Sequence, residues 1–367
     1  MVAQACAPVM GGVESHVEDL RRGLEARGHE VLVVCGRGGP QARRGNGTLR
    51  SAAIACADLF SADPLDEPGL KGLLADIHTR FRPDVLHVHN PNHFAPALAE
   101  AVLGLDAPWR RVASVHDRPL EPSCNEILTF GWDHVLFASA YLRGALPRPP
   151  RSSVLHLGID TSVFRPETTP HAGLVYCERP LIFHPARLLS WKGVLDSARA
   201  FVQLRDEFGS GTLLVPESNE ILSHRQRVRQ LRDEIVRILT DAGLADTVLF
   251  RDFSRAEMPA AYAASDIVWY PTRAEEPYGL VPLEAMACGR PVVVTASGGM
   301  RETMIDGRGA TIIQPGDVGA LARASIDLLR DTERRRAMGA QGARHVGGLS
   351  LDTYLDGLES VYGWRDP

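Results

Sequence analysis

The chain has 367 residues, of which 44% are hydrophobic and 23% are charged, which is typical of a soluble globular protein with more than one domain. Its formal net charge of −5 argues against a nucleic-acid-binding protein, because such a protein needs a basic face to neutralise phosphates. The first 165 residues hold 17 basic and 18 acidic side chains, which argues against a polybasic membrane anchor.

Strand-like apolar runs alternate with helix-like stretches along the first part of the chain. A helix-period stretch covers residues 13–27, and the strand-like runs lie at residues 2–6, 29–35, 84–89, 111–116 and 134–139. After a stretch rich in prolines and turn-forming residues at 156–170, further strand-like runs follow at residues 181–187, 211–216, 246–253, 266–271, 291–295 and 309–314. Such alternation is typical of βαβ units, and hence of parallel sheets covered by helices on both faces.

Two such series predict two doubly wound α/β domains that bind ligands at the carboxyl ends of their strands. We place the first domain at residues 1–165 and the second at 166–350. Residues 351–367 carry apolar side chains at helical spacing, and we expect this helix to pack back on the first domain.

The sequence favours a cytoplasmic location without strong membrane association. No stretch reaches the ~20 apolar residues of a membrane span, and the apolar run at residues 1–12 is short for a signal peptide. The six cysteines stand singly, without the Cys-x-x-Cys pairs of a zinc or redox site, so we expect reduced thiols.

Two segments resemble anion-binding turns. Gly11 and Gly12 lie between the first strand and its helix, where backbone N–H groups can approach a phosphate, although glycine at such a turn is at least as often steric. In "PARLLSWKGV", Arg187 and Lys192 lie between a strand end and a helix start and could hold a diphosphate. Lys192 is one of only two lysines, with Lys71, among 40 basic residues, which favours a function over an ordinary solvated charge.

The segment "EEPYGLVPLEAMACG" at residues 275–289 places two carboxylates in mostly apolar surroundings. Glu276 lies in the turn after a strand, and Glu284 lies in the first turns of a short helix. The N–H groups of residues 278–280 are expected to point toward the same edge of the sheet. Carboxylates suit sugar and ribose hydroxyls, because each oxygen accepts two hydrogen bonds. Two exposed surface charges are the simpler alternative, but the apolar neighbours disfavour it.

This segment resembles the signature of the retaining glycosyltransferases of the fourth family, which carry a Glu-x7-Glu motif. The resemblance extends over nearly the whole chain and includes "PVMGGVESHVEDLRRGLEARGHEV", "RPDVLHVHN", "VASVHD", "LHLGIDTSVFRP" and "PARLLSWKGV". It implies the GT-B architecture, in which two Rossmann-like domains face each other across a cleft, with an acceptor-binding first domain and a donor-binding second domain. The chain departs from the family in its short N-terminal edge and in "LLVPESNEILSHRQ", which replaces a glycine-rich turn and leaves the identity of the nucleotide open.

The resemblance also implies roles for single residues. Glu284 corresponds to the acid that holds the ribose, and Glu276 to the acid that meets the transferred sugar. His116 matches a histidine near the reacting carbon, whereas a lone histidine at a strand end is more often structural. The other matched donor contacts fall into three sets. They are the phosphate-contacting residues Gly12, Arg187 and Lys192, the turn residues Tyr278, Gly279 and Leu280, and the residues near the nucleotide base, Asp252 and Phe253.

The resemblance predicts transfer of a hexose or N-acetylhexosamine from a nucleotide sugar, with UDP as the expected nucleotide, without a cofactor. The chain has no Asp-x-Asp pair, which fits metal-independent transfer in which side-chain cations meet the charge of the leaving diphosphate. We expect the acceptor, a small soluble molecule, to bind the first domain. The candidate contacts are His89, Asn90, Asp117, Glu121 and Glu126.

The three acidic candidates would suit a cationic aminocyclitol of the kind found in aminoglycoside antibiotics, although a solvated loop explains each acid singly. Two alternatives remain: a non-hydrolysing sugar-nucleotide epimerase, and a non-catalytic partner subunit that has kept the fold. A dehydrogenase is disfavoured, because we find no glycine fingerprint followed by an acidic residue about 20 positions later.

Overall fold

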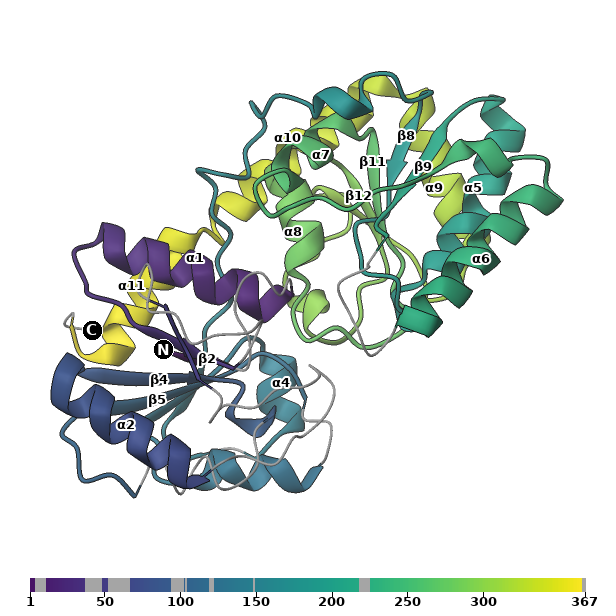
Figure 1. Ribbon diagram of the computed structural model, residues 1–367. Coiled ribbons are helices and arrows are strands. Elements are labelled where there is room, and N and C mark those ends of the chain that lie inside the picture. Colours follow the sequence, from purple (N-terminus) through teal and green to yellow (C-terminus); the bar gives the residue numbers. More distant parts are fainter. Residues whose placement is uncertain are drawn as a thin grey trace. The chain divides into compact units, whose positions relative to one another are not determined.

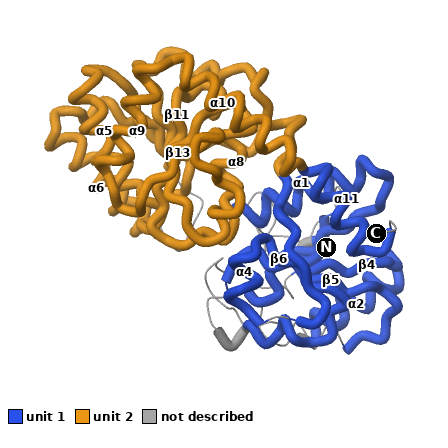
Figure 2. The backbone as a smooth tube through the Cα atoms, turned by 180° about the vertical axis from the view of Figure 1, so that it is seen from behind, with its two compact units in different colours: residues 1–158, 351–367 blue, residues 159–350 orange. Residues whose placement is uncertain are grey.

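The computed structural model in Figure 1 describes residues 1–3, 11–36, 48–51, 67–93, 102, 104–118, 122–147, 149–217 and 225–364. The chain forms two compact units, which are coloured separately in Figure 2. The first unit consists of residues 1–158 and 351–367, and the second of residues 159–350. The last helix in the sequence therefore belongs to the same unit as the first.

The first unit is built on a seven-stranded sheet in the order β3-β2-β1-β4-β5-β6-β7, with parallel neighbours. Its strands are β1 (Val2–Ala3), β2 (Val33–Cys35), β3 (Thr48–Arg50), β4 (Val85–His89), β5 (Arg110–Val115), β6 (His134–Phe137) and β7 (Ser152–Val154). The strand order reverses direction between β1 and β4, so this is the switch point at which doubly wound sheets bind ligands.

Helices cover both faces of this sheet. In Figure 1, α1 (Gly12–Ala26) and α11 (Leu351–Tyr362) lie on one face and α2 (Glu67–Phe81) lies on the other. The short helix α4 (Ala140–Ala145) follows β6. Helix α1 buries Val17, Leu20 and Leu24, whose spacing of three and four residues forms one apolar stripe. The two helices on the first face approach closely, because a Cβ added to Gly23 would lie 2.6 Å from the side chain of Leu355.

The second unit repeats the same topology with six parallel strands in the order β10-β9-β8-β11-β12-β13. Its strands are β8 (Leu181–Phe183), β9 (Thr212–Val215), β10 (Val248–Phe250), β11 (Ile267–Tyr270), β12 (Val292–Val294) and β13 (Ala310–Ile312). The switch point lies between β8 and β11, so the segments that follow these two strands meet at one place on the carboxyl edge.

Within the described residues, six α-helices pack around this second sheet. The helices α5 (Val194–Phe208), α6 (Arg225–Asp241) and α9 (Val318–Arg330) bury their apolar stripes against one face, in a core that includes Ile182, Leu213 and Trp269. The helices α7 (Met258–Ala264), α8 (Leu280–Ala287) and α10 (Thr332–Gly347) lie on the opposite face in Figure 1. The sheet is therefore covered on both sides, which explains its continuous apolar strands.

The predicted α/β class with two doubly wound sheets is confirmed, but some local expectations are wrong. Strands β3 and β7 were not predicted. Each has only three residues and lies at an edge of the first sheet, so its hydrophobic pattern in the sequence is weak. Cys177 and Cys288 are free thiols as expected, whereas Cys35, at the carboxyl end of β2, is disulfide-bonded. Among the described helices, none has the length and apolar character needed to cross a bilayer.

Candidate active site

The carboxyl edge of the second sheet brings together Lys192 and Glu276. Lys192 ends the 3₁₀ turn Ser190–Lys192 after β8, and Glu276 lies in the loop after β11. The ammonium of Lys192 donates a short hydrogen bond to Oε1 of Glu276 and a second one, 2.8 Å long, to the hydroxyl of Tyr270. The hydroxyl of Thr272 also lies 3.3 Å from Oε1 of Glu276. Glu276 is only 7% exposed, so it is a buried carboxylate with a cationic partner.

The surroundings keep these groups in defined protonation states. Burial alone would lower the pKa of Lys192, but Tyr270 and Glu276 face its ammonium and raise that pKa above its usual value. Burial raises the pKa of Tyr270 to about 12, and Glu276 acts in the same direction. At neutral pH the site therefore contains a charged ammonium and a neutral phenol.

Arg187 adds a second cation after β8. It follows Phe183, the last residue of that strand, by four positions. Its Nη1 atom is buried and has no hydrogen-bond partner within the described part of the chain. An unpaired buried guanidinium nitrogen is costly unless a ligand satisfies it, so the arrangement suits an anion with several acceptor oxygens.

Glu284 lies in the middle of α8 and has different partners. It is 6% exposed, and its two carboxylate oxygens accept hydrogen bonds from Arg255, a short one, and from the hydroxyl of Tyr262 at 3.1 Å. The guanidinium of Arg255 also lies 4.6 Å from the ring centre of Phe164. Both motif carboxylates are thus buried and paired, and the alternative of two exposed surface charges is wrong.

The turn before α8 has a backbone shape that only glycine adopts easily. Gly279 precedes α8 with φ of +95°, and a Cβ at this position would lie 2.4 Å from the side chain of Met300. Tyr278 is buried, and Leu280 is the first residue of the helix. The amides of this first turn have no partner inside the helix, which makes the end of α8 suitable for an anion.

The loop after β10 contains Asp252 and Phe253. Asp252 is exposed, whereas the half-buried ring of Phe253 packs edge-on against His171 and Phe183, with ring centres 5.4 and 5.9 Å apart. Phe253 therefore supports the end of β8 from the side of β10. This packing does not test the predicted contact of the loop with the nucleotide base, which stays a prediction.

In the first unit, His116 follows β5 and lies beside the end of β4. Its Nε2 is 2.9 Å from Nδ1 of His89, and its backbone N–H donates a 2.7 Å hydrogen bond to Oδ1 of Asn90. The two imidazole rings are stacked with an interplanar angle of 9°. His89 is fully buried and His116 is 7% exposed, so His89 is the less accessible of the two.

Further side chains extend this histidine pair into a buried cluster. His87 lies 2.6 Å from the hydroxyl of Tyr362 and 2.7 Å from that of Ser114, and the ring of His16 packs against His116 at 5.2 Å. Burial lowers the pKa of His116 to about 3, with His93 acting in the same direction. Burial also lowers the pKa values of His87 and His89 well below the usual value, so these three histidines are neutral at physiological pH.

The remaining predicted residues of the first unit lie near this cluster in sequence. Gly12 is the first residue of α1, after the extended Gly11. Asp117 directly follows His116, and its carbonyl accepts a 3.0 Å hydrogen bond from the amide of Asn92. Glu126 is exposed in the 3₁₀ helix Pro122–Thr129, and Glu121 lies outside the described residues.

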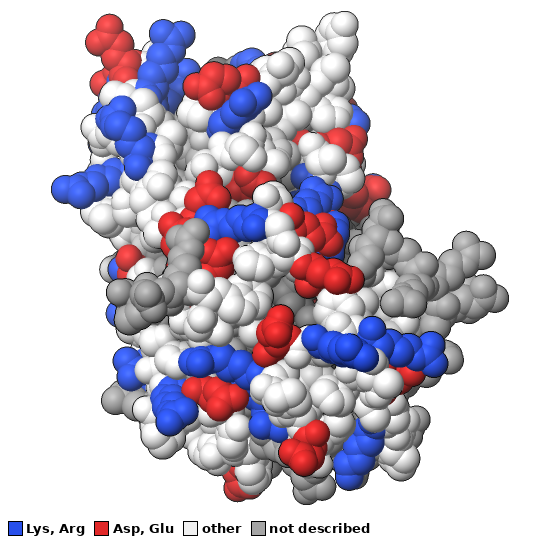
Figure 3. All heavy atoms as spheres, turned by 90° about the vertical axis from the view of Figure 1, so that its left-hand side faces the viewer, with Lys and Arg blue, Asp and Glu red and all other residues white. Residues whose placement is uncertain are grey.

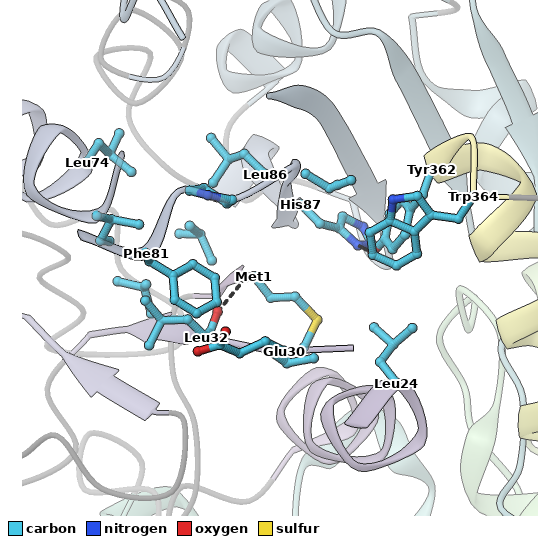
Figure 4. A pocket seen from close by; sticks show the side chains of 16 residues that line it. Met1, Leu24, Glu30, Leu32, Leu74, Phe81, Leu86, His87, Tyr362 and Trp364 are labelled. Atoms are coloured by element: carbon cyan, nitrogen blue, oxygen red, sulfur yellow. Dashed lines mark hydrogen bonds between the residues drawn. The ribbon is translucent and has the colours of Figure 1, made fainter. Parts of the chain in front are cut away.

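A cavity of about 60 Å³ lies elsewhere in the first unit, at the amino ends of its strands (Figure 4). Its lining is mainly apolar, with Leu24, Leu74 and Phe81 among the side chains, and the N-terminal amine of Met1 donates a 2.7 Å hydrogen bond to the carbonyl of Leu32. The candidate residues of this unit follow the carboxyl ends of β4 and β5, so the cavity belongs to the opposite edge of the sheet.

Charged side chains of both signs are intermixed on the face drawn in Figure 3. This distribution agrees with the near balance of 40 basic and 45 acidic residues in the sequence.

Comparison with known proteins identifies the family. Residues 168–345 match the family described as "Glycosyl transferases group 1", and residues 10–163 match "Glycosyltransferase Family 4". A GDP-mannose-dependent alpha-(1-6)-phosphatidylinositol monomannoside mannosyltransferase of Mycobacterium tuberculosis is 30% identical over 94% of this chain and 92% of its own length. The chain belongs to the glycosyltransferases.

Other relatives of this glycosyltransferase include one protein with the same name and one with a different name. A Mycolicibacterium smegmatis enzyme with the same name as the mycobacterial relative is 34% identical over 228 residues, which are 58% of this chain and 57% of that protein. The N-acetyl-alpha-D-glucosaminyl L-malate synthase of Bacillus anthracis is 26% identical over 93% of this chain and 90% of its own length. Family membership thus gives the reaction type and a nucleotide-sugar donor.

Solved structures show the same fold over the whole glycosyltransferase. Sucrose-phosphate synthase of Thermosynechococcus elongatus has a TM-score of 0.77 at 20% identity and covers 99% of this chain and 98% of its own. An Anabaena protein solved with UDP and glucose has a TM-score of 0.74 at 20% identity, and 99% of each chain is covered. The predicted GT-B fold class is confirmed.

The sequence did not reveal several partners of the motif residues. Tyr270 and Thr272 contact Lys192 or Glu276, and Arg255 and Tyr262 contact Glu284. Tyr270 is the next-to-last residue of the strand-like run at 266–271, so its place at the carboxyl edge was a usable signal. Arg255 is 29 residues from Glu284 and had no such signal.

Proposed function

We propose that this glycosyltransferase is a cytoplasmic, retaining and metal-independent hexosyltransferase. It transfers a hexose or N-acetylhexosamine from a UDP-linked donor to a hydroxyl of a small soluble acceptor, for which we suggest an aminocyclitol. The second unit binds the donor, and the first unit binds the acceptor. The observation that carries the proposal is the buried Lys192–Glu276–Tyr270 cluster at the switch point of the second sheet. Arg187 follows the same strand as Lys192, and its buried Nη1 has no hydrogen-bond partner in the described part of the chain.

The proposed donor contacts follow from the charge of each group. Lys192, Arg187 and the amides at the start of α8 would meet the diphosphate, because they are the positive groups at this edge. Glu276 would accept hydrogen bonds from sugar hydroxyls, and Glu284 from ribose hydroxyls, since a carboxylate oxygen already bonded once can accept a second hydrogen bond.

The proposed chemistry is loss of the diphosphate from the anomeric carbon with attack by the acceptor hydroxyl on the same face. As the bond to the sugar breaks, negative charge grows on the leaving phosphate oxygen, and preorganised cations stabilise that charge. The leaving oxygen takes the proton of the incoming hydroxyl, so no side chain needs to act as a covalent nucleophile. His116, whose Nδ1 is buried and has no hydrogen-bond partner within the described residues, is the proposed sugar contact of the first unit.

The acceptor proposal depends on groups of the first unit. Asp117 and Glu126 supply negative charge close to His89, Asn90 and His116 in sequence, and Glu121 would add to it. This charge favours a cationic polyol such as an aminocyclitol. The relatives support a second candidate acceptor, because the mycobacterial enzyme is named for GDP-mannose and a phosphatidylinositol mannoside. Mannosyl transfer from GDP-mannose to an inositol-containing acceptor is therefore the alternative.

A mass-spectrometric transfer assay tests the proposal. The protein is incubated with UDP-glucose, UDP-N-acetylglucosamine or GDP-mannose and with an aminocyclitol, inositol 3-phosphate or malate. We expect transfer with one donor, an α-linkage in the product by NMR, and a loss of about 100-fold or more in kcat/KM for Lys192→Ala and Glu276→Ala. Glu333→Ala, an exposed position on α10, is the control and should keep full activity.

The possible failures of this assay have different meanings. If calorimetry finds no binding of any of the three sugar nucleotides, the transferase proposal is wrong. If transfer occurs but both active-site variants keep wild-type kcat/KM, the residues are assigned wrongly. A β-linked product from these α-linked donors would overturn the retaining mechanism alone.

A further inference from the structure

Polar contacts join the two loops of the second unit that carry Lys192 and Glu276. The first loop contains Trp191 and Lys192 before α5, and the second contains residues 271–276 after β11. The carbonyl of Trp191 accepts a 2.7 Å hydrogen bond from the backbone N–H of Arg273 and a 3.1 Å hydrogen bond from the hydroxyl of Thr272. The second loop is thus held to the residue directly before Lys192.

An ion pair joins the same two segments through side chains. The guanidinium of Arg273 donates two hydrogen bonds to Asp196, of 2.7 Å from Nε and 2.6 Å from Nη2, one to each carboxylate oxygen. Asp196 lies in the first turn of α5, and its side chain is only 3% exposed. This two-point geometry fixes the orientation of the guanidinium as well as its position.

The backbones of the two loops also touch. Gly193, between Lys192 and α5, has φ of +77°, and a Cβ there would lie 2.0 Å from the carbonyl oxygen of Pro271. Only glycine fits this approach. The contact places the start of α5 directly against the end of the segment that follows Tyr270, so movement of one loop requires movement of the other.

Asp196 has other stabilising groups besides Arg273. A carboxylate in the first turn of a helix is already favoured by the helix dipole and the open N–H groups. Arg199 lies 3.6 Å from the same carboxylate as a second cation. The side chain of Arg273 remains 53% exposed, so it contributes little to the core. What Arg273 adds is a fixed distance between the two loops.

We propose that Arg273 and Asp196 form a positioning latch that holds Lys192 and Glu276 at the separation required by the diphosphate and the sugar of one donor. This inference rests on the proposed function, because it concerns the donor contacts assigned there. Neither latch residue is among the proposed donor contacts. Loss of the latch keeps both donor-binding side chains but removes one of the links that fix the distance between their loops, and misplacements of about 1 Å can cost on the order of 100-fold in rate.

The test compares sugar nucleotides, whose diphosphate and sugar would contact the loops of Lys192 and Glu276, with nucleosides, which lack both groups. Dissociation constants are measured for uridine and guanosine by NMR titration, and for UDP-glucose and GDP-mannose by calorimetry. For Arg273→Met, we expect affinity for the bound sugar nucleotide to fall about tenfold or more, while affinity for its nucleoside, which Glu284 would hold, stays within about twofold. Arg273→Lys keeps the charge but not the two-point geometry and should lose most of the same affinity.

Two further variants separate positioning from stability. Asp196→Asn combined with Arg273→Met removes the buried charge together with its partner, so it should be at least as thermally stable as Arg273→Met without regaining sugar-nucleotide affinity. Arg205→Met is the matched control, because Arg205 makes a 2.6 Å ion pair with Glu178 at the other end of α5. This control should lose some stability but bind both classes of ligand as the wild type does.

The outcomes distinguish the latch from the proposed function. If the wild type binds a sugar nucleotide and the Arg273 variants bind it equally well, the latch is wrong and the donor site stands. Equal losses for nucleoside and sugar nucleotide would show a purely structural role and would also overturn the latch. If the wild type binds no sugar nucleotide, the proposed function fails and the latch fails with it.

Discussion

The two carboxylates of the Glu-x7-Glu segment are buried, and each has its own cationic partner. Glu276 pairs with Lys192, whereas Glu284 pairs with Arg255. A buried charge without a partner is strongly unfavourable, so these pairs explain how an apolar segment tolerates two acidic side chains. They also orient both carboxylates as hydrogen-bond acceptors, which contacts with hydroxyl groups require.

The sequence predicts these two acids and Lys192, but not the side chains that hold Glu284. Glu276 and Lys192 were found because both lie after predicted strands at a carboxyl edge. The partners of other buried acids come from distant positions: Arg273 is 77 residues from Asp196, and Arg255 is 29 residues from Glu284. Such pairs depend on which strands are neighbours and on side-chain directions, and periodicity contains neither.

Tyr270→Phe tests the local environment of Lys192. The phenol of Tyr270 accepts a hydrogen bond from the Lys192 ammonium, and hydrogen bonds to charged groups contribute about 1.5–3 kcal/mol. Glu276 remains as a partner in the variant, so we expect the lower end of this range. The dissociation constant of the sugar nucleotide should rise about tenfold by calorimetry, with little change in kcat at saturating donor.

Tyr176→Phe serves as the control for this substitution. Tyr176 belongs to the same unit and is 95% exposed, so removal of its hydroxyl should change neither affinity nor stability. Unchanged donor affinity in Tyr270→Phe would contradict the assignment of Tyr270 as a support for Lys192.

At the scale of elements, hydrophobic periodicity located the central strands to within a few residues. The predicted runs at 84–89, 266–271 and 291–295 contain β4, β11 and β12, because each of these strands is largely buried and rich in apolar residues. The edge strands β3 and β7 gave no comparable signal. The sequence therefore located the switch points, where the candidate residues gather, better than the borders of the sheets.

Close packing of α10 against the end of α8 depends on glycine. A Cβ at Gly339 would lie 2.1 Å from the carbonyl oxygen of Gly289, a backbone atom that cannot rotate away. We expect Gly339→Ala to destabilise the second unit by about 1–3 kcal/mol, because overpacking forces the backbone to shift. Urea unfolding followed by tryptophan fluorescence measures this loss.

The same helix supplies the matched control for this substitution. Gly347 is the last residue of α10, and a Cβ added there would meet nothing within 4 Å in the described part of the chain. Gly347→Ala should therefore be neutral or stabilising by up to about 1 kcal/mol. Equal effects of the two substitutions would show that helix propensity, and not the contact between α10 and residue 289, determines the result.

At the scale of the whole molecule, the two units have the same winding but different buried ionisable groups. In each unit the strand order reverses between the first strand and its neighbour, β4 or β11, and the candidate residues follow these strands. The second unit buries ion pairs at this edge, whereas the first buries neutral histidines. The units should therefore respond differently to acid.

The pH dependence of stability follows from the buried histidines. Burial lowers the pKa values of His87 and His89 well below the usual value and that of His116 to about 3, and neighbouring positive groups act in the same direction. In the unfolded chain these groups titrate near the usual value of about 6.5. Between the folded and unfolded pKa values the unfolded state binds more protons, so stability rises with pH and is lost as pH falls below about 6.5.

We therefore expect acidification from pH 7.5 to 5.5 to destabilise the first unit more than the second, which has His184 as its one fully buried histidine with a lowered pKa among the described residues. Each such histidine costs on the order of 1 kcal/mol per pH unit within the window. Carboxylates contribute little above pH 5.5, because their usual pKa values lie lower. Thermal unfolding with proteolysis and mass spectrometry assigns each transition to a unit. Equal shifts of both transitions, or a larger shift in the second unit, would contradict this account, because only the first unit has several buried histidines to protonate in the described part of the chain.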